Sequence, residues 1–396
     1  MPAGILREVN AQPSARPSWS ELFYDLVLIG AFLSFGVDFG SDPTWESGLV
    51  LALKLMLIVW SWEQAALFFN RFGDPFNQQR RHENIRTALR FAFLVQLVAV
   101  ICVSLVESSK MALDAFTGDL GFAGAAVVIS MALIYELGGR WKPQLRELAS
   151  LRRNAGLAAG ALFIGSGVAA PPLSTALWIA GLAVAMVATF GPGMGSIVKR
   201  FPINRSHFSE RLALFVLILI GDVFVKTVIT VHEETVDSVD VMQLAFVAVA
   251  MWMLWAIYER EIASRPMPEG TRGMRFWMLA HYLFAITLLV CSVGLVWYIA
   301  PDYQKITGDW IAMVASGGVG VAIGLIALMR LAAGADGARA GAGRLLVISA
   351  VACSIGLLAW LATPSNWRVG VGALAVSLVL LNHWRSASDV REVEPG

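Results

Sequence analysis

The sequence is short of charged residues, and that shortage excludes a class of protein. Only 15% of the 396 residues are Asp, Glu, Lys or Arg, against about 25% in an ordinary soluble domain. So few charges cannot coat a soluble particle of this size, which argues strongly against a water-soluble enzyme. The 30 basic and 29 acidic residues balance each other, so a nucleic-acid-binding protein is not expected either.

Cysteine is also scarce. Cys102, Cys291 and Cys353 each lie alone in an apolar run, so their spacing gives neither a disulfide framework nor a zinc site. The sequence contains no phosphate-binding loop, nucleophile elbow, Cys–His pair or H-E-x-x-H motif. We therefore predict no metal, no cofactor and no catalytic residue.

Apolar residues make up 57% of the chain, and the mean hydropathy is +0.66. With about 20 residues for each membrane span, twelve apolar segments would cross a lipid bilayer. They are residues 20–39, 48–69, 87–106, 120–138, 155–170, 174–191, 209–230, 240–258, 275–299, 309–329, 344–362 and 367–383. The fifth and sixth are separated only by Pro171-Pro172, so a re-entrant hairpin would fit them almost as well. The predicted fold class is an all-α, polytopic membrane protein.

The basic residues predict the orientation of these spans. Loops on one side, together with the two termini, hold 25 of the 30 Lys and Arg residues, and the opposite loops hold Lys110, Lys305 and Arg368. Because cytoplasmic loops are enriched in Lys and Arg, both termini are expected in the cytoplasm. The first apolar segment is interrupted by Glu21 and Asp25, so we do not expect it to be a cleaved signal peptide.

The two halves of the chain align at a constant offset of 189 residues. The rarer residues that recur are Ser20-Glu21 with Ser209-Glu210, Arg71 with Arg260, Arg86 with Arg275, Cys102 with Cys291 and Trp178 with Trp367. We interpret residues 1–191 and 192–396 as two six-helix repeats. An even number of spans makes them parallel repeats, related by an axis along the membrane normal.

Ionisable and polar residues inside predicted spans are functional candidates by default, because burying them in hydrocarbon is costly. The predicted site residues are Glu21, Asp25, Glu63, Asn70, Arg71, Glu210, Arg211, Asp222 and His281. Most fall in one layer toward the cytoplasmic side. We expect the acids to face the bundle interior, within reach of a basic side chain.

Several candidates also have a structural interpretation. Ser18 and Glu21 match a helix capping box, whereas Asp25 lies one turn deeper and cannot cap. Glu63 would equally form a buried ion pair with a facing arginine. Arg71 would extend to the membrane interface, and His281 would be a hydrogen-bonded packing residue.

Asp222 is the deepest acid in the chain and the first candidate for handling a proton or cation. It follows Gly221, which would let another backbone approach closely. Lys226 lies four residues further on, so the two charges would either neutralise each other or separate if Lys226 extends outward.

Two segments resemble a known family. Glu21-Leu-Phe-Tyr-Asp25-Leu-Val-Leu-Ile29 is similar to the opening signature of the bacterial low temperature requirement A (LtrA) family. His207-Phe-Ser-Glu210-Arg211, running on to Gly221-Asp222, resembles a second motif of that family, with Asp222 where Glu is usual. The resemblance covers nearly the whole chain and implies a multi-pass protein of the bacterial inner membrane, but it implies no mechanism. A fainter resemblance is to the two-repeat lysosomal potassium channels, whose six-helix halves also open with an acidic-aromatic motif.

The function that these observations favour is movement of an ion or small solute, with proton coupling as one form of it. Two alternatives stay open. One is a membrane enzyme acting on lipid or glycan, and the other is a non-transporting envelope-regulating or assembly protein. The expected partners are the bilayer, an unidentified solute or ion, and a second copy of the chain in a homo-oligomer.

Overall fold

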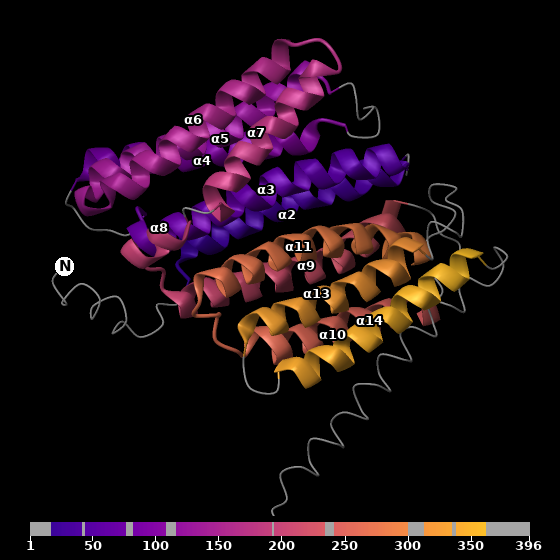
Figure 1. Ribbon diagram of the computed structural model, residues 1–396. Helices are drawn as coiled ribbons and strands as arrows, with labels where there is room; N and C mark the ends of the chain where they lie inside the picture. Colours follow the sequence, from indigo (N-terminus) through magenta and orange to yellow (C-terminus); the bar gives the residue numbers. More distant parts are fainter. Residues whose placement is uncertain are drawn as a thin grey trace, which may run out of the picture. The chain divides into compact units, whose positions relative to one another are not determined.

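The computed structural model describes residues 17–41, 44–76, 82–107, 116–191, 194–233, 241–299, 313–334 and 338–361. Every regular element within these ranges is helical. The longer helices are α2 (Trp19–Ser41), α3 (Trp45–Phe72), α4 (Glu83–Leu105), α5 (Gly118–Trp141), α6 (Arg146–Val168), α7 (Leu173–Phe190), α9 (Arg205–Glu233), α10 (Val241–Tyr258), α11 (Thr271–Ile299), α13 (Gly318–Ala333) and α14 (Ala338–Leu361) (Figure 1). Shorter elements are the 3-10 turn Pro143–Leu145, α8 (Met194–Arg200) and the π-helical turns Glu259–Ala263 and Met313–Gly317.

Eleven of the twelve predicted apolar segments coincide with these helices, and the twelfth, 367–383, lies outside the described residues. Seven stretches are long and apolar enough to cross a membrane, judged by length and composition over the described residues. They are Trp45–Phe72, Glu83–Leu105, Gly118–Trp141, Leu173–Phe190, Arg205–Ile229, Thr271–Ile299 and Met313–Ala333. The chain is therefore an all-helical, multi-pass membrane protein.

Local sequence explains where several helices begin and end. Thr44 and Ser47 form a capping box at the start of α3, each side chain accepting the other residue's backbone N–H. The same helix ends at Gly73, whose φ of 77° few other residues adopt. At α9, the Asn204 side chain accepts the backbone N–H of His207 at 3.2 Å, which fixes the first turn of that helix.

Helix α6 begins nine residues before its predicted apolar segment. The prediction began too late because the first turns of the helix carry charged residues, which an apolar pattern does not include. Arg153 in this extension donates to Glu136 of α5 at 2.7 Å. Two spans were predicted on either side of Pro171-Pro172, with a re-entrant hairpin as the alternative. The structure has two long helices there, α6 and α7, that pack against each other. Of the two, only α7 is among the seven potential spans.

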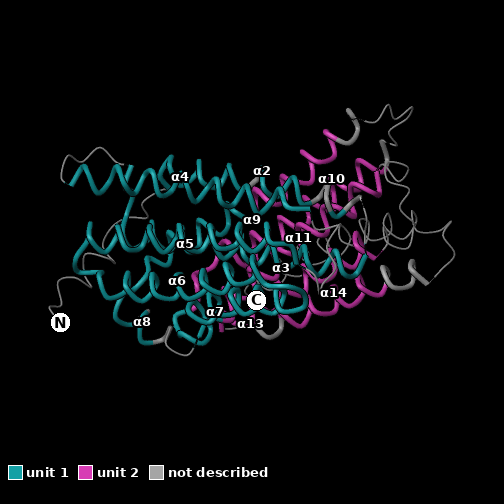
Figure 2. Tube along the Cα trace, turned by 90° about the horizontal axis from the view of Figure 1, so that it is seen from above, with its two compact units in different colours: residues 1–215, 269–275 teal, residues 216–268, 276–396 magenta. Residues whose placement is uncertain are grey.

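The chain forms two compact units (Figure 2). Unit 1 comprises residues 1–215 and 269–275, and unit 2 comprises residues 216–268 and 276–396. The boundary between the units therefore lies inside α9, whereas the predicted repeat boundary lies at residues 191/192. The first turns of α9 belong to unit 1 because the side chains of Arg211 and Phe215 bind α2 and α3 there.

Within unit 1, α5 packs between α4 and α6. Glycines permit the close approach of α5 and α6: a Cβ added to Gly121 would lie 2.5 Å from the backbone N of Gly167. On α6, Gly156 and Gly160 form the spacing of small residues that is common where membrane helices touch. In unit 2, α13 packs against α14 in the same way.

Candidate functional site

Five side chains of unit 1 meet in a buried group that we call the acid–arginine cluster. Its members are Glu21 and Asp25 of α2, Trp62 of α3, and His207 and Arg211 of α9. Arg211 lies at its centre and forms an ion pair with each acid, to Glu21 Oε2 and, at 2.7 Å, to Asp25 Oδ1. Asp25 and Arg211 are each 0% exposed.

Glu21 has two roles, one for each oxygen. Its Oε1 accepts the N–H and the hydroxyl of Ser18, at 3.4 and 3.1 Å, and the Ser18 hydroxyl accepts the N–H of Glu21. That is the capping box predicted from the sequence. Its Oε2 lies between Arg211 and His207, whose Nε2 is 3.4 Å away. The capping and functional interpretations of Glu21 are therefore compatible.

Asp25 accepts both of its hydrogen bonds on one oxygen. The indole N–H of Trp62 and the Nη2 of Arg211 each donate to Oδ1 at 2.7 Å. The other oxygen, Oδ2, is buried and has no hydrogen-bond partner among the described residues. A buried, unpaired carboxylate oxygen is costly, so the ionised form of Asp25 is unfavourable at this position.

Aromatic rings surround the guanidinium group of Arg211. Its Cζ lies 5.9 Å from the centre of the Trp62 ring and 6.0 Å from that of Phe69, within cation–π range. Phe215 stacks on Trp62 at 4.1 Å. These rings exclude water and lower the local dielectric constant, which strengthens every charge interaction inside.

Asn70, another predicted site residue, fixes the protonation of His207. Its carboxamide forms a double hydrogen bond with the backbone of Asn204, donating to the carbonyl and accepting the N–H at 2.9 Å each. The same Asn70 Nδ2 lies 3.3 Å from His207 Nδ1. Because Asn70 presents an N–H there, Nδ1 must accept, and the ring's own hydrogen lies on Nε2, facing Glu21.

Two other predicted residues of unit 1, Glu63 and Arg71, belong to a different polar group. Arg71 donates through Nε to the carbonyl of Phe201 at 3.2 Å and interacts electrostatically with Glu63, Tyr135 and Arg152. Glu63 is 1% exposed. Glu210, the neighbour of Arg211, is half-buried and interacts electrostatically with His207. The predicted layer of polar groups is thus divided into separate clusters.

A hydrogen-bonded junction centred on Thr189 of α7 was not predicted from the sequence. Its hydroxyl oxygen is within 3.0–3.1 Å of Trp60 Nε1, Gln64 Nε2 and Arg152 Nη1. Arg152 lies just outside the predicted apolar segment 155–170 and is buried on α6. A signal was present: positions 149, 152, 156 and 159 are all buried on α6 and follow the spacing of one helix face.

Asp222, in unit 2, is buried and paired with a cation. Lys226 Nζ forms an ion pair with Asp222 Oδ2 and donates to Ser292 of α11 at 2.9 Å. The predicted close backbone approach at Gly221 is not found among the described residues, since none of their atoms outside the helix's own backbone lies within 4 Å of a Cβ added there. The i,i+4 spacing on α9 lets the two charges neutralise each other.

His281 and Arg260, also in unit 2, have structural partners. His281 Nδ1 lies 2.8 Å from the carbonyl of Trp277, and its Nε2 lies 3.1 Å from the hydroxyl of Tyr258. Both ring nitrogens therefore form hydrogen bonds within unit 2. Arg260 lies 3.4 Å from the buried Glu261, which also pairs with Arg330 of α13.

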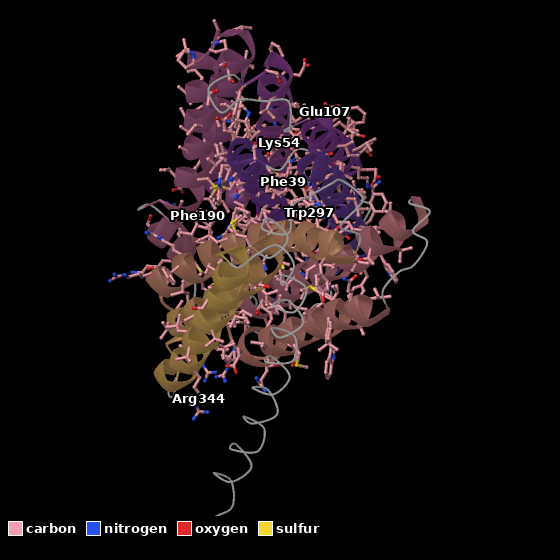
Figure 3. All side chains as sticks on the ribbon, turned by 90° about the vertical axis from the view of Figure 1, so that its right-hand side faces the viewer. Phe39, Lys54, Glu107, Phe190, Trp297 and Arg344 are labelled. Carbon is pink, nitrogen blue, oxygen red and sulfur yellow. The ribbon has the colours of Figure 1, made fainter. Side chains whose placement is uncertain are left out.

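Another buried cation, Lys54, lies on α3 of unit 1 (Figure 3) and donates to the carbonyl of Val106. Its Nζ is 4.8 Å from the ring centre of Phe35. Over the described residues, no group of three His, Cys, Asp or Glu side chains is arranged to hold a metal ion.

Comparison with known proteins identifies the family that the two sequence motifs resemble. The family model for bacterial low temperature requirement A proteins matches residues 16–378, a range that includes every member of the acid–arginine cluster. The uncharacterized protein RA0937 of Rhizobium meliloti (strain 1021) is 24% identical over 304 residues, which cover 74% of this chain and 69% of that protein. No solved structure matches.

Proposed function

The chain belongs to the bacterial low temperature requirement A protein family, and from that premise we propose that it moves an ion or a small solute across the bacterial inner membrane. The acid–arginine cluster of unit 1 is the proposed binding site on the path. The family resemblance inferred from the motifs around Glu21 and Arg211 is confirmed. The transport function is our inference from the cluster.

One observation carries the proposal, namely the unequal charge of the cluster. Glu21 and Asp25 bring two carboxylates, Arg211 brings one guanidinium, and the contacts of His207 fit its neutral form. An isolated buried charge costs several kcal/mol in a low-dielectric setting. A cluster with one extra negative charge is therefore suited to take up and release one positive ion.

The buried ion pair of unit 2 supports this choice of site. Asp222 and Lys226 carry one charge of each sign, so they need no mobile ion. Glu21 caps α2 through Ser18, so a structural role already accounts for that acid. Asp25 is bound only by Trp62 and Arg211 and is the acid that a binding function explains.

We also propose the finer topology, with twelve spans in two parallel repeats and cytoplasmic termini. The helix order supports it: α9 begins 186 residues after α2, and α11 begins 188 residues after α4. These separations are close to the offset of 189 found in the sequence.

The test is charge movement in liposomes that contain the purified protein, after steps in the H⁺, Na⁺, K⁺ or Cl⁻ gradient. We expect a current for at least one ion, and a large loss of it in Asp25→Asn. The matched control is Asp119→Asn, which removes an exposed acid at the start of α5 and should conduct as the wild type does. Currents equal to those of protein-free liposomes for all four ions would contradict the proposal and favour a non-transporting role.

A further inference from the structure

We propose that the ion held by the acid–arginine cluster is a proton, and that its binding atom is Oδ2 of Asp25. This inference rests on the proposed function in that it names the ion of the same site. The step is a simple proton transfer: an O–H bond of hydronium breaks, an O–H bond forms on Oδ2, water is released, and the cluster becomes neutral.

His207 is not the proton acceptor, although histidine is the usual titrating group near neutral pH. Its Nδ1 already accepts from Asn70 Nδ2 at 3.3 Å. The carboxamide of Asn70 cannot turn round without breaking both of its hydrogen bonds to Asn204. A second hydrogen on the ring would therefore face the N–H of Asn70, so the geometry keeps His207 neutral.

Glu21 is not the acceptor either, because donors occupy both of its oxygens. Ser18 donates to Oε1 with its backbone and its hydroxyl. Arg211 and the Nε2–H of His207 approach Oε2. A proton on either oxygen would displace a donor or break the helix cap.

Asp25 has the one carboxylate oxygen of the cluster without a donor. Oδ1 keeps its hydrogen bonds from Trp62 and Arg211 whether or not Oδ2 carries a proton. Oδ2 is buried and without a hydrogen-bond partner among the described residues. Protonation there removes a buried charge and costs no existing contact.

The charged and titratable groups that face Asp25 and its partners come from two helices. Glu21 and Tyr24 lie on α2, and Arg211, His207 and Glu210 lie on α9, while α3 contributes the uncharged Trp62. Glu210 is half-buried, so water screens its charge. The buried balance remains two acids against one arginine.

A metal cation fits this geometry poorly. Ions such as Ca²⁺ and Mg²⁺ require six or more oxygen ligands, and the groups around Asp25 are mostly N–H donors, from Trp62, Arg211 and His207. A proton requires a single lone pair, which Oδ2 supplies.

The experiment is infrared difference spectroscopy of the wild-type protein in lipid vesicles during acidification. We expect a carboxylic-acid C=O band to appear, and to shift when the protein is labelled with ¹³C-carboxyl aspartate but not with ¹³C-carboxyl glutamate. The band should be absent in Asp25→Asn and present in Asp119→Asn and in the double variant Asp222→Asn, Lys226→Gln.

The labelling result uses the unmodified chain, so it does not depend on whether Asp25→Asn folds. A band that follows the glutamate label, or one that persists unchanged in a folded Asp25→Asn, would overturn the assignment to Asp25. Titration of His207 in place of a carboxyl band, seen by NMR of ¹⁵N-histidine, would overturn it as well. Spectra report binding alone, so an aspartate band in a protein that carries no current would contradict transport and leave the proton site intact.

Discussion

At the scale of single residues, Arg211 is the side chain on which the cluster depends. It is fully buried and binds two acids that lie 190 and 186 residues earlier in the chain. Removing one partner from a buried ion pair leaves the others uncompensated, which is far more costly than losing a surface pair.

We expect Arg211→Met to lower the free energy of unfolding by about 3–5 kcal/mol, measured by thermal denaturation in detergent. The difference from wild type should shrink at low pH, because protonation of Asp25 removes the repulsion between the two carboxylates. The matched control on the same helix is Arg205→Met, whose partner Glu269 is 92% exposed; it should change stability by less than about 0.5 kcal/mol. Equal effects of the two substitutions would show that the cluster does not stabilise the fold.

The Asp222–Lys226 pair makes a second prediction at this scale. Asp222→Asn leaves the buried ammonium of Lys226 unpaired, so we expect a clear drop in melting temperature. The double variant Asp222→Asn, Lys226→Gln removes both charges and should recover most of that loss in melting temperature. The difference between the double variant and the sum of the single variants measures the interaction energy of the pair. Additive losses would mean that the two residues do not act as a pair.

At the scale of helices, the sequence predicts the positions of the helices better than it predicts the contacts of the candidate site. Apolar runs bounded by charges place eleven helices correctly, because burial in lipid forces such segments to satisfy their own backbone hydrogen bonds. The capping box at Ser18 and Glu21 was also predictable, since it is local. The junction at Thr189 and the hydrogen bond between Asn70 and His207 were not, because they join helices far apart in the chain and depend on how those helices pack.

The α5–α6 contact gives a prediction at the helix scale. Gly121→Ala would place a Cβ 2.5 Å from the backbone of Gly167, and backbone cannot move aside as a side chain can. We expect a destabilisation of about 1–3 kcal/mol. In contrast, a Cβ added to Gly221 of α9 has no atom of the described residues within 4 Å, apart from the helix's own backbone. Gly221→Ala should be neutral or stabilising by up to about 1 kcal/mol, because alanine favours helix. Thermal unfolding in detergent measures both, and a stable Gly121→Ala protein would contradict the close packing.

At the scale of the whole molecule, the alternating basic loops predict which residues face outward. In a background without the three native cysteines, single cysteines at Ser41, Ser238 and Ser365 should react with an impermeant thiol reagent added to whole cells. Cysteines at Gln79 and Ser264 should react only after the cells are opened. Labelling of the second set alone would invert the topology.

The proposed transport depends on a proton that moves through Asp25. The most direct measurement is the internal pH of liposomes containing the protein, recorded with a trapped dye after the outside is acidified under a clamped membrane potential. We predict rapid acidification with the wild type and with Asp119→Asn, and a rate equal to that of protein-free liposomes with Asp25→Asn. Acidification by folded Asp25→Asn at the wild-type rate would contradict the account.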